Sequence, residues 1–143
     1  MIYLLDVNVL IALLDQNHVD HERSIDWFEE HGSAGWATCP LTENGLIRIL
    51  GHARYPKGPG TPEGAAELLS GLCAVGARAF WSDEISLLDP AVARASAIPG
   101  SGAVTDTYLL ALARFRGGSL ATLDRRLSAA SVPDGADHLH LIT

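Results

Sequence analysis

The chain has 143 residues, of which 48% are hydrophobic and 19% are charged, and its formal net charge is −7. This size and composition predict one globular domain, residues 1–143, with a full hydrophobic core. The net negative charge excludes a protein that binds nucleic acid through its overall electrostatic field. It does not exclude a nucleic-acid enzyme whose acidic residues are gathered in a metal site.

The first fourteen residues form an apolar run that holds one carboxylate, Asp6, and one carboxamide, Asn8. Ile2 to Leu5 predicts a strand buried on both faces of a parallel sheet, and Val9 to Leu14 predicts the first turns of a buried helix. Asp6 therefore lies where strand becomes helix, which is where ligands bind in open α/β sheets. Taken alone, Asp6 is explained equally well as the N-cap of the helix.

The next segments predict a surface helix over residues 17–31, a strand over residues 36–39 and a helix from Pro40 to about residue 52. Glu43 falls in the first turn of that last helix, where the helix dipole favours an acid in any case. His18 and His21 could share a helix face and bind zinc. Because no cysteine or third histidine follows at ligand spacing, a solvated helix start is the better interpretation.

Residues 54–62 form the one loop rich in proline and glycine, and with Arg48, His52, Arg54 and Lys57 this is the most basic part of the chain. A solvated turn and a contact with phosphate both remain open. The loop lacks the Lys-Ser/Thr pair of a phosphate-cradling loop, so we expect no nucleotide cofactor.

The middle of the chain carries no evident chemistry. Residues 62–75 predict a helix, residues 79–81 a third strand, and residues 90–97 a short helix that begins at a proline.

The last third of the chain predicts a second strand with an acid at its end. Residues 107–116 form a strongly amphipathic helix ended by Gly117-Gly118, and residues 119–123 form the next buried strand. Asp124 comes directly after that strand, and Asp106 comes directly before the helix. The tail, residues 138–142, alternates like an edge strand with exposed histidines.

Four acids can converge in this arrangement, because right-handed winding brings the carboxyl ends of parallel strands to one edge of the sheet. They are Asp6, Glu43, Asp106 and Asp124. Carboxylates that lie close together must bind protons or hold a cation, and oxygen ligands suit Mg²⁺ or Mn²⁺. Such a cluster is typical of phosphodiester hydrolysis, where the ion activates a water and neutralises the developing charge.

Four stretches of the sequence resemble, in order, the acidic motifs of the PIN-domain ribonucleases. They are Leu4 to Leu10, Thr42 to Leu50, Val104 to Ala113 and Leu120 to Asp124. The resemblance covers essentially the whole chain and is strongest to the VapC toxins of bacterial toxin–antitoxin pairs. With the predicted alternation of strands and helices, it implies an α/β/α sandwich around a central, mainly parallel sheet.

The resemblance also implies roles for individual residues. The acids match the positions that hold the metal ion directly or, for Glu43, directly or through water: Asp6, Glu43, Asp106 and Asp124. Two small polar residues match the positions that orient these acids: Asn8 and Thr122. Arg48, Arg125 and Arg126 are candidates for contacts with phosphate.

Members of this family are typically Mg²⁺- or Mn²⁺-dependent endoribonucleases that cut single-stranded or loop RNA. They form homodimers and are silenced by an antitoxin whose tail enters the acidic groove. The resemblance therefore implies one or two divalent ions, a water activated for in-line attack on an RNA phosphodiester, a VapB-like antitoxin as partner, and a homodimer.

Two other functions fit parts of the pattern. A phosphatase of the haloacid-dehalogenase kind also places an Asp after its first strand, but it needs a second Asp two residues later and a downstream lysine. Here Asn8 follows, and Lys57 is the only lysine. The other alternative is a catalytically silent module that acts only by binding antitoxin or RNA, and metal-dependent turnover separates it from the enzyme.

Two cysteines without a Cys-x-x-Cys spacing are typical of a reducing compartment. The first apolar run is too short to span a bilayer, and no basic segment precedes it. We therefore expect a cytoplasmic protein with no membrane partner.

Overall fold

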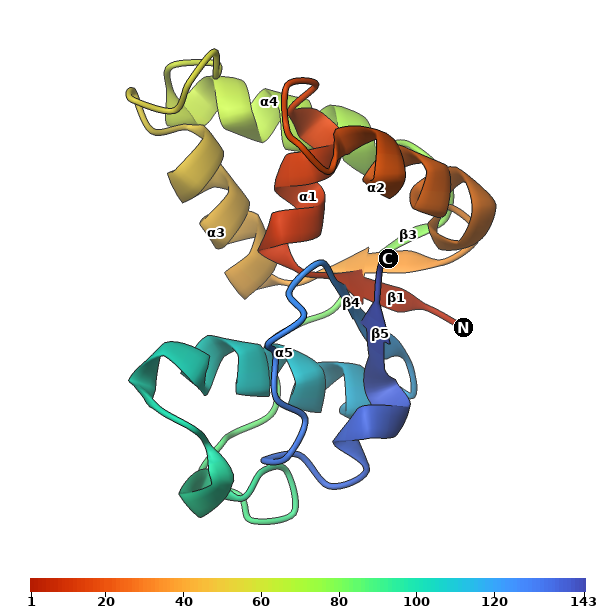
Figure 1. Cartoon of the computed structure of the whole chain (residues 1–143), viewed down its shortest axis with the longest axis vertical. Coiled ribbons are helices and arrows are strands. Elements are labelled where there is room, and N and C mark those ends of the chain that lie inside the picture. Colours follow the sequence, from red (N-terminus) through yellow and green to blue (C-terminus); the bar gives the residue numbers. More distant parts are fainter.

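A five-stranded parallel sheet forms the centre of the computed structural model, which describes residues 1–143 (Figure 1). The strands lie in the order β3-β2-β1-β4-β5, and every neighbouring pair is parallel. Their bounds are β1 Tyr3–Leu5, β2 Trp36–Thr38, β3 Arg78–Phe80, β4 Ser119–Thr122 and β5 Leu139–Leu141. With helices on both faces, this arrangement confirms the predicted α/β/α sandwich.

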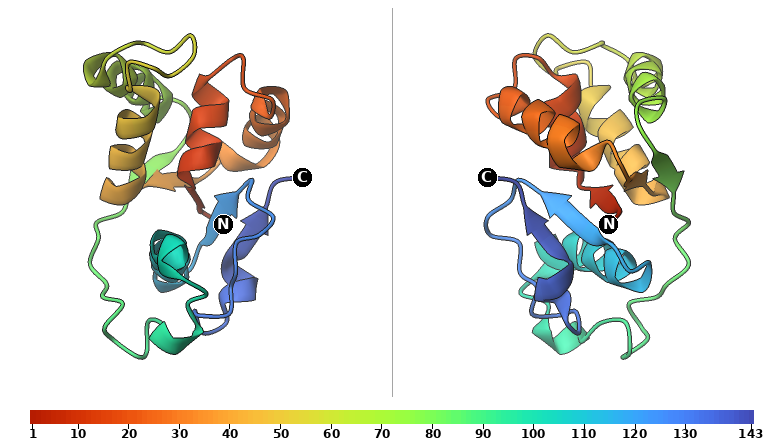
Figure 2. Two further views of the ribbon diagram at one scale, coloured as in Figure 1. Left: turned by 60° about the vertical axis from the view of Figure 1, so that its left-hand side comes forward. Right: turned by 90° about the vertical axis from the view of Figure 1, so that its right-hand side faces the viewer.

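Five α-helices cover the two faces of the sheet: α1 Val7–Leu14, α2 His21–Trp27, α3 Pro40–Leu50, α4 Pro62–Cys73 and α5 Val104–Phe115. The first four lie on one face and α5 lies on the other, as the rotated views show (Figure 2). A π-helical turn, Phe28–Gly32, continues α2 without a break. None of the helices is both long and apolar enough to cross a lipid bilayer.

The core strands send alternate side chains into two separate cores. Leu4 and Leu120, which are paired across β1 and β4, pack with α5, whereas the next residues, Leu5 and Ala121, pack with α1 to α4. All four side chains are fully buried. Burial on both faces explains why the strands are continuous apolar runs rather than alternating ones.

The strand order reverses direction at β1. The chain passes from β1 outward through β2 to β3, and then returns to place β4 on the other side of β1. In open parallel sheets the crevice at such a reversal, beside the carboxyl ends of the strands, is the ligand site. The residues that directly follow β1 and β4 are Asp6 and Leu123-Asp124.

The helix predicted over residues 90–97 is wrong. Only a short 3-10 turn forms there, Ala95–Ala97. The Asp89 carboxylate accepts the backbone N–H of Ala91 at 2.9 Å, and the backbone N–H of Arg94 donates to the Ser131 carbonyl at 2.7 Å. These bonds give the backbone alternatives to a helical ladder.

The two histidines of the tail are half-buried, so the prediction that they are exposed is wrong. His138 donates through Nδ1 to the Gly118 carbonyl at 2.7 Å, and His140 Nε2 accepts the indole N–H of Trp27 at 2.9 Å. Trp27, from α2, covers this edge strand. The alternating pattern of the strand does not predict this contact.

Candidate active site

Asp6 connects β1 to α1 and is only 7% exposed. Its Oδ1 accepts the backbone N–H of Val7 at 2.7 Å, so it does cap α1. Its Oδ2 accepts the Thr122 hydroxyl at 2.8 Å, so capping accounts for only one of its two oxygens. Burial raises the pKa of Asp6, although both hydrogen bonds oppose the increase, and the charge of Asp124 adds to it.

The Thr122 hydroxyl uses its full hydrogen-bonding capacity. It donates to Asp6, and it accepts from Asn8 Nδ2 and from the backbone N–H of Asp124, both at 3.1 Å. A hydroxyl has one proton and two lone pairs. Because two N–H donors occupy the lone pairs, the proton is directed at the Asp6 carboxylate. This single buried group ties the end of β4 to the end of β1.

Asn8 lies in the first turn of α1 and completes the same network. Its Oδ1 accepts the backbone N–H of Leu123 at 3.1 Å, and its Nδ2 donates to Thr122 and, at 3.4 Å, to Asp6. The Leu123 N–H can only donate, so the amide has one orientation. The structure thus places both predicted orienting residues, Asn8 and Thr122, in contact with Asp6.

Asp106 belongs to the first turn of α5, on the opposite face of the sheet from α1. Burial, together with the negative charges of Asp6 and Asp124, raises the pKa of Asp106 to about 6. Asp124 is exposed, and its Oδ1 accepts the backbone N–H of Arg126 at 2.9 Å. The three aspartates therefore interact electrostatically at the point where the strand order reverses.

A cavity of about 400 Å³ opens between α1, α3 and α5, and Asp6 and Asp106 line it. The α3 residues that line it share one helix face: Leu41, Asn44, Gly45, Arg48 and Ile49. Gly45 allows α3 to approach this closely, because a Cβ there would lie 2.7 Å from the Val7 Cγ2 atom. Arg48, one of the predicted phosphate contacts, therefore shares the cavity with two of the acids.

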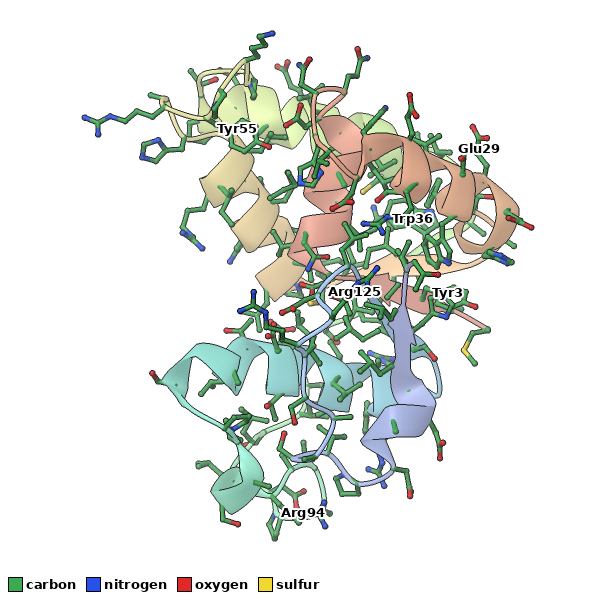
Figure 3. The ribbon with its side chains drawn as sticks, in the orientation of Figure 1. Tyr3, Glu29, Trp36, Tyr55, Arg94 and Arg125 are labelled. Carbon is green, nitrogen blue, oxygen red and sulfur yellow. The ribbon has the colours of Figure 1, made fainter.

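The other two predicted phosphate contacts, Arg125 and Arg126, are exposed and directly follow Asp124. Arg125 lies near the centre of the molecule, where the two helical layers meet (Figure 3). Neither arginine lines the cavity that holds Asp6 and Asp106.

Glu43 is not among the residues that line the cavity of Asp6 and Asp106. Its Oε2 accepts the hydroxyl of Thr38, the buried last residue of β2, at 2.7 Å. The charges that raise the pKa of Asp106 come from the other two aspartates. A second polar side chain of α3 lines the cavity beside Arg48, namely Asn44, which sequence reasoning missed. Its spacing from Leu41 and Arg48 is the signal that could have found it.

The three aspartates suit a hard divalent cation, because ionised carboxylates close together repel one another unless a positive charge lies between them. No three Asp, Glu, His or Cys side chains form a ready ligand cage for a metal ion. Mg²⁺ usually needs only one or two carboxylates and keeps several waters, so its binding does not require such a cage. His21, which with His18 was the alternative zinc pair, uses its ring to donate to the Ala12 carbonyl at 2.7 Å.

Comparison with known proteins shows the family to which the chain belongs. The PIN-domain family model matches residues 3–133. The chain is 43% identical over 140 residues to Ribonuclease VapC44 of Mycobacterium tuberculosis, covering 98% of this chain and 97% of the relative. It is also 43% identical over 122 residues to Ribonuclease VapC38 of the same organism, covering 85% and 84%.

One similar solved structure is VapBC2 from Rickettsia felis bound to a DNA fragment from its promoter. It has a TM-score of 0.56 and 11% sequence identity over 88% of this chain and 90% of that one, a likeness of fold. From the family match and the full-length identity to the mycobacterial relatives, the chain belongs to the PIN-domain family, among the VapC-type ribonucleases.

Proposed function

We propose that this protein is a metal-dependent endoribonuclease that acts as the toxin of a toxin–antitoxin pair. The observation that carries the proposal is the group of three aspartates, Asp6, Asp106 and Asp124, whose charges and burial raise the pKa of Asp106 to about 6. The relatives named as VapC ribonucleases support the same activity.

In this proposal the three aspartates hold Mg²⁺ or Mn²⁺. When bound, the ion supplies an activated water and neutralises charge on the phosphodiester that is cut. Thr122 and Asn8 keep the Asp6 carboxylate in one orientation through the hydrogen bonds already described. Glu43 binds the ion directly or through water, and the Thr38 hydroxyl, which donates to its Oε2, leaves its other oxygen free for this role.

Arg48 is suited to bind the phosphate of the substrate. It lines the same cavity as Asp6 and Asp106, and its guanidinium can donate two parallel hydrogen bonds to phosphate oxygens. Asn44, on the same face of α3, offers further donors toward the same space.

We further propose a VapB-type antitoxin as partner and a homodimer as the working assembly. The partner is supported by the VapBC complex among similar solved structures. The homodimer rests on the family resemblance. Two unpaired cysteines, Cys39 and Cys73, suit the reducing cytoplasm in which such a pair would act.

The group of aspartates also argues against the catalytically silent module. Burying Asp106 close to two other acids raises its pKa and costs the folded protein free energy at neutral pH. A surface that only binds RNA gains nothing from these acids, because phosphate is itself negatively charged, whereas a cation site uses them. Metal-dependent cleavage separates the enzyme from a module that only binds antitoxin.

The test is cleavage of total RNA by purified, antitoxin-free protein in Mg²⁺, in Mn²⁺ and in chelator, with Asp106→Asn alongside. We expect discrete products that require metal and that the variant does not form. Absence of products from a folded wild-type protein under every condition, or normal cleavage by the variant, would overturn the proposal.

A further inference from the structure

A recess of about 360 Å³ lies at the end of α3, beside the candidate active site. Six residues line it: Arg48, Ile49, His52, Arg54, Tyr55 and Pro56. Two of them are arginines, one is a histidine, and none is acidic. In a chain whose net charge is −7, this is a local concentration of positive charge.

The recess adjoins the aspartate cavity, because Arg48 and Ile49 line both of them. His52 follows Arg48 by four residues, and Arg54 lies in the turn after the helix, so the two arginines extend the positive charge from the aspartate cavity along and beyond α3. Tyr55 marks the far end of this path, past the C-terminal end of α3 (Figure 3). An elongated polyanion seated at the aspartates would pass along this path.

Tyr55 gives the recess an aromatic wall that is held in place. Its hydroxyl donates to Asp15 Oδ2 at 2.6 Å, which fixes the ring against the end of α1. The His52 Nδ1 accepts the backbone N–H of Arg54 at 3.0 Å, and the His52 carbonyl accepts the backbone N–H of Tyr55 at 2.9 Å. The turn that carries both Arg54 and Tyr55 is therefore held by several hydrogen bonds.

We propose that this recess binds one nucleotide of a single-stranded RNA substrate, next to the phosphate that is cut. Tyr55 stacks on the base, and Arg48 and Arg54 contact the phosphates on either side of it. Unpaired bases stack on aromatic side chains whatever their sequence, and arginines pair with the backbone phosphates. The inference rests on the proposed nuclease function, whose substrate path it specifies.

An acidic peptide is the other polyanion that the arginines could attract. A carboxylate chain would use the charges but would have little use for an aromatic wall. The arginines together with the fixed ring of Tyr55 favour RNA. The property to test is whether binding requires that ring.

The test is RNA binding in chelator, where a metal-dependent nuclease cannot cut its ligand. The probe is a short fluorescein-labelled single-stranded RNA of mixed sequence, followed by anisotropy over roughly 50 to 200 mM salt. The proteins are the full-length wild type, Arg54→Gln, and Arg94→Gln as control. Arg94 is also an exposed arginine, and it lies at the opposite end of the molecule from Tyr55 (Figure 3).

Loss of one phosphate contact should reduce the slope of log affinity against log salt by about 0.7 for a single strand. We expect this change in Arg54→Gln and no change of slope in Arg94→Gln. Equal slopes for the two variants would overturn the phosphate contact.

The ring is tested by a matched pair, Tyr55→Phe and Tyr55→Leu. Both variants lose the hydrogen bond to Asp15, and only the first keeps the ring. We expect Tyr55→Leu to bind about tenfold more weakly than Tyr55→Phe, a loss typical of one stacked base. A thermal melt of each variant checks that it is folded. Equal affinities of the two folded variants, or equal binding of duplex and single strand, would overturn the stacking.

This test is separate from the test of the proposed function. Metal-dependent cleavage together with unaltered binding by the Arg54 and Tyr55 variants would keep the nuclease and reject the recess. Binding that depends on the recess without any cleavage would keep the recess as an RNA site and reject the nuclease.

Discussion

Thr122 and Asp6 are 116 positions apart in the chain, yet the Thr122 hydroxyl donates a hydrogen bond of 2.8 Å to the Asp6 carboxylate. The bond joins the two strands between which the strand order reverses, at the place where the candidate metal ligands gather. The same hydrogen bond therefore joins the two central strands and orients a candidate metal ligand. Changes at Thr122 should affect both stability and activity.

Thr122→Val keeps the shape of the side chain and removes its hydroxyl. The variant leaves the donors of Asn8 and Asp124 without their acceptor in a buried place, so we expect it to lose about 2 kcal/mol of unfolding free energy. We also expect a loss of RNA cleavage. Thr122→Ser, which keeps the hydroxyl, is the control. Urea unfolding of the two variants measures their free energies of unfolding. A valine variant as stable as the serine variant would contradict the hydrogen-bond network.

Asp106→Asn should make the metal-free protein more stable at neutral pH. The raised pKa of Asp106, about 6 against an ordinary 3.8, means that its contribution to stability is present below about pH 4 and is lost as the pH rises through about 6. Asparagine avoids that loss, which we put at about 1 kcal/mol after discounting for solvent exposure.

Urea unfolding in chelator at several pH values checks this prediction. The difference between Asp106→Asn and wild type should be largest above about pH 7 and should shrink toward about pH 4. A difference that is constant over this range would show that neither burial nor the charges of Asp6 and Asp124 raise the pKa of Asp106.

Gly45→Ala should weaken the contact between α3 and α1. A Cβ at this position would lie 2.7 Å from the Val7 Cγ2 atom, and the β-branched side chain of valine has little freedom to move away. We expect a loss of about 1 kcal/mol despite the better helix propensity of alanine, together with slower cleavage because the neighbouring residues Asp6 and Arg48 shift.

Gly71→Ala is the matched control for that substitution. Gly71 is also inside a helix, α4, but a Cβ there would meet no atom within 4 Å. We expect it to stabilise the protein by about 0.5 to 1 kcal/mol. Thermal melts of the two variants should therefore shift in opposite directions, and a shift in the same direction would contradict the close packing at Gly45.

Tyr55→Phe should destabilise the protein by about 1 kcal/mol in the middle of the pH range, because it removes a hydrogen bond to a carboxylate at the surface. That bond lowers the pKa of Asp15 and, with burial, raises the pKa of Tyr55 to about 12. The Asp15 contribution is present above about pH 4 and is lost as the pH falls below it.

The Tyr55 contribution has the opposite dependence: it is present below about pH 10 and is lost as the pH rises toward about 12. The difference between Tyr55→Phe and wild type, measured by urea unfolding, should therefore be largest between these limits and should shrink at both ends. A difference that grows at low pH would contradict the assigned bond.

Hydrophobic patterns in the sequence predicted a parallel sheet of buried strands alternating with helices and the positions of Asp6 and Asp124 at strand ends, and the family resemblance added the α/β/α sandwich. The first two conclusions depend only on short apolar runs and on the rule that parallel strands end at one edge. The contacts of Thr122 with Asp6 and Asn8 could not follow from spacing, because they join segments far apart in the chain, although the family resemblance implied these roles.

The features that the sequence did not predict depend on which side of a helix faces the site and on contacts between residues far apart in the chain. Glu43 and Asn44 are adjacent, and only the packing of α3 decides that Asn44 lines the cavity while Glu43 meets Thr38. His140 is half-buried because Trp27 covers it, and that contact crosses 113 positions. Each of these features depends on tertiary packing, which local patterns do not record.

The central claim is that Asp6, Asp106 and Asp124 together bind a divalent ion, and the most direct measurement is a Mn²⁺ titration followed by electron paramagnetic resonance of the free ion. We expect the wild-type protein to remove one or two Mn²⁺ ions per chain from the free signal, and Asp106→Asn to bind far more weakly while remaining folded. Equal binding by the two proteins, or no binding by either, would contradict the account.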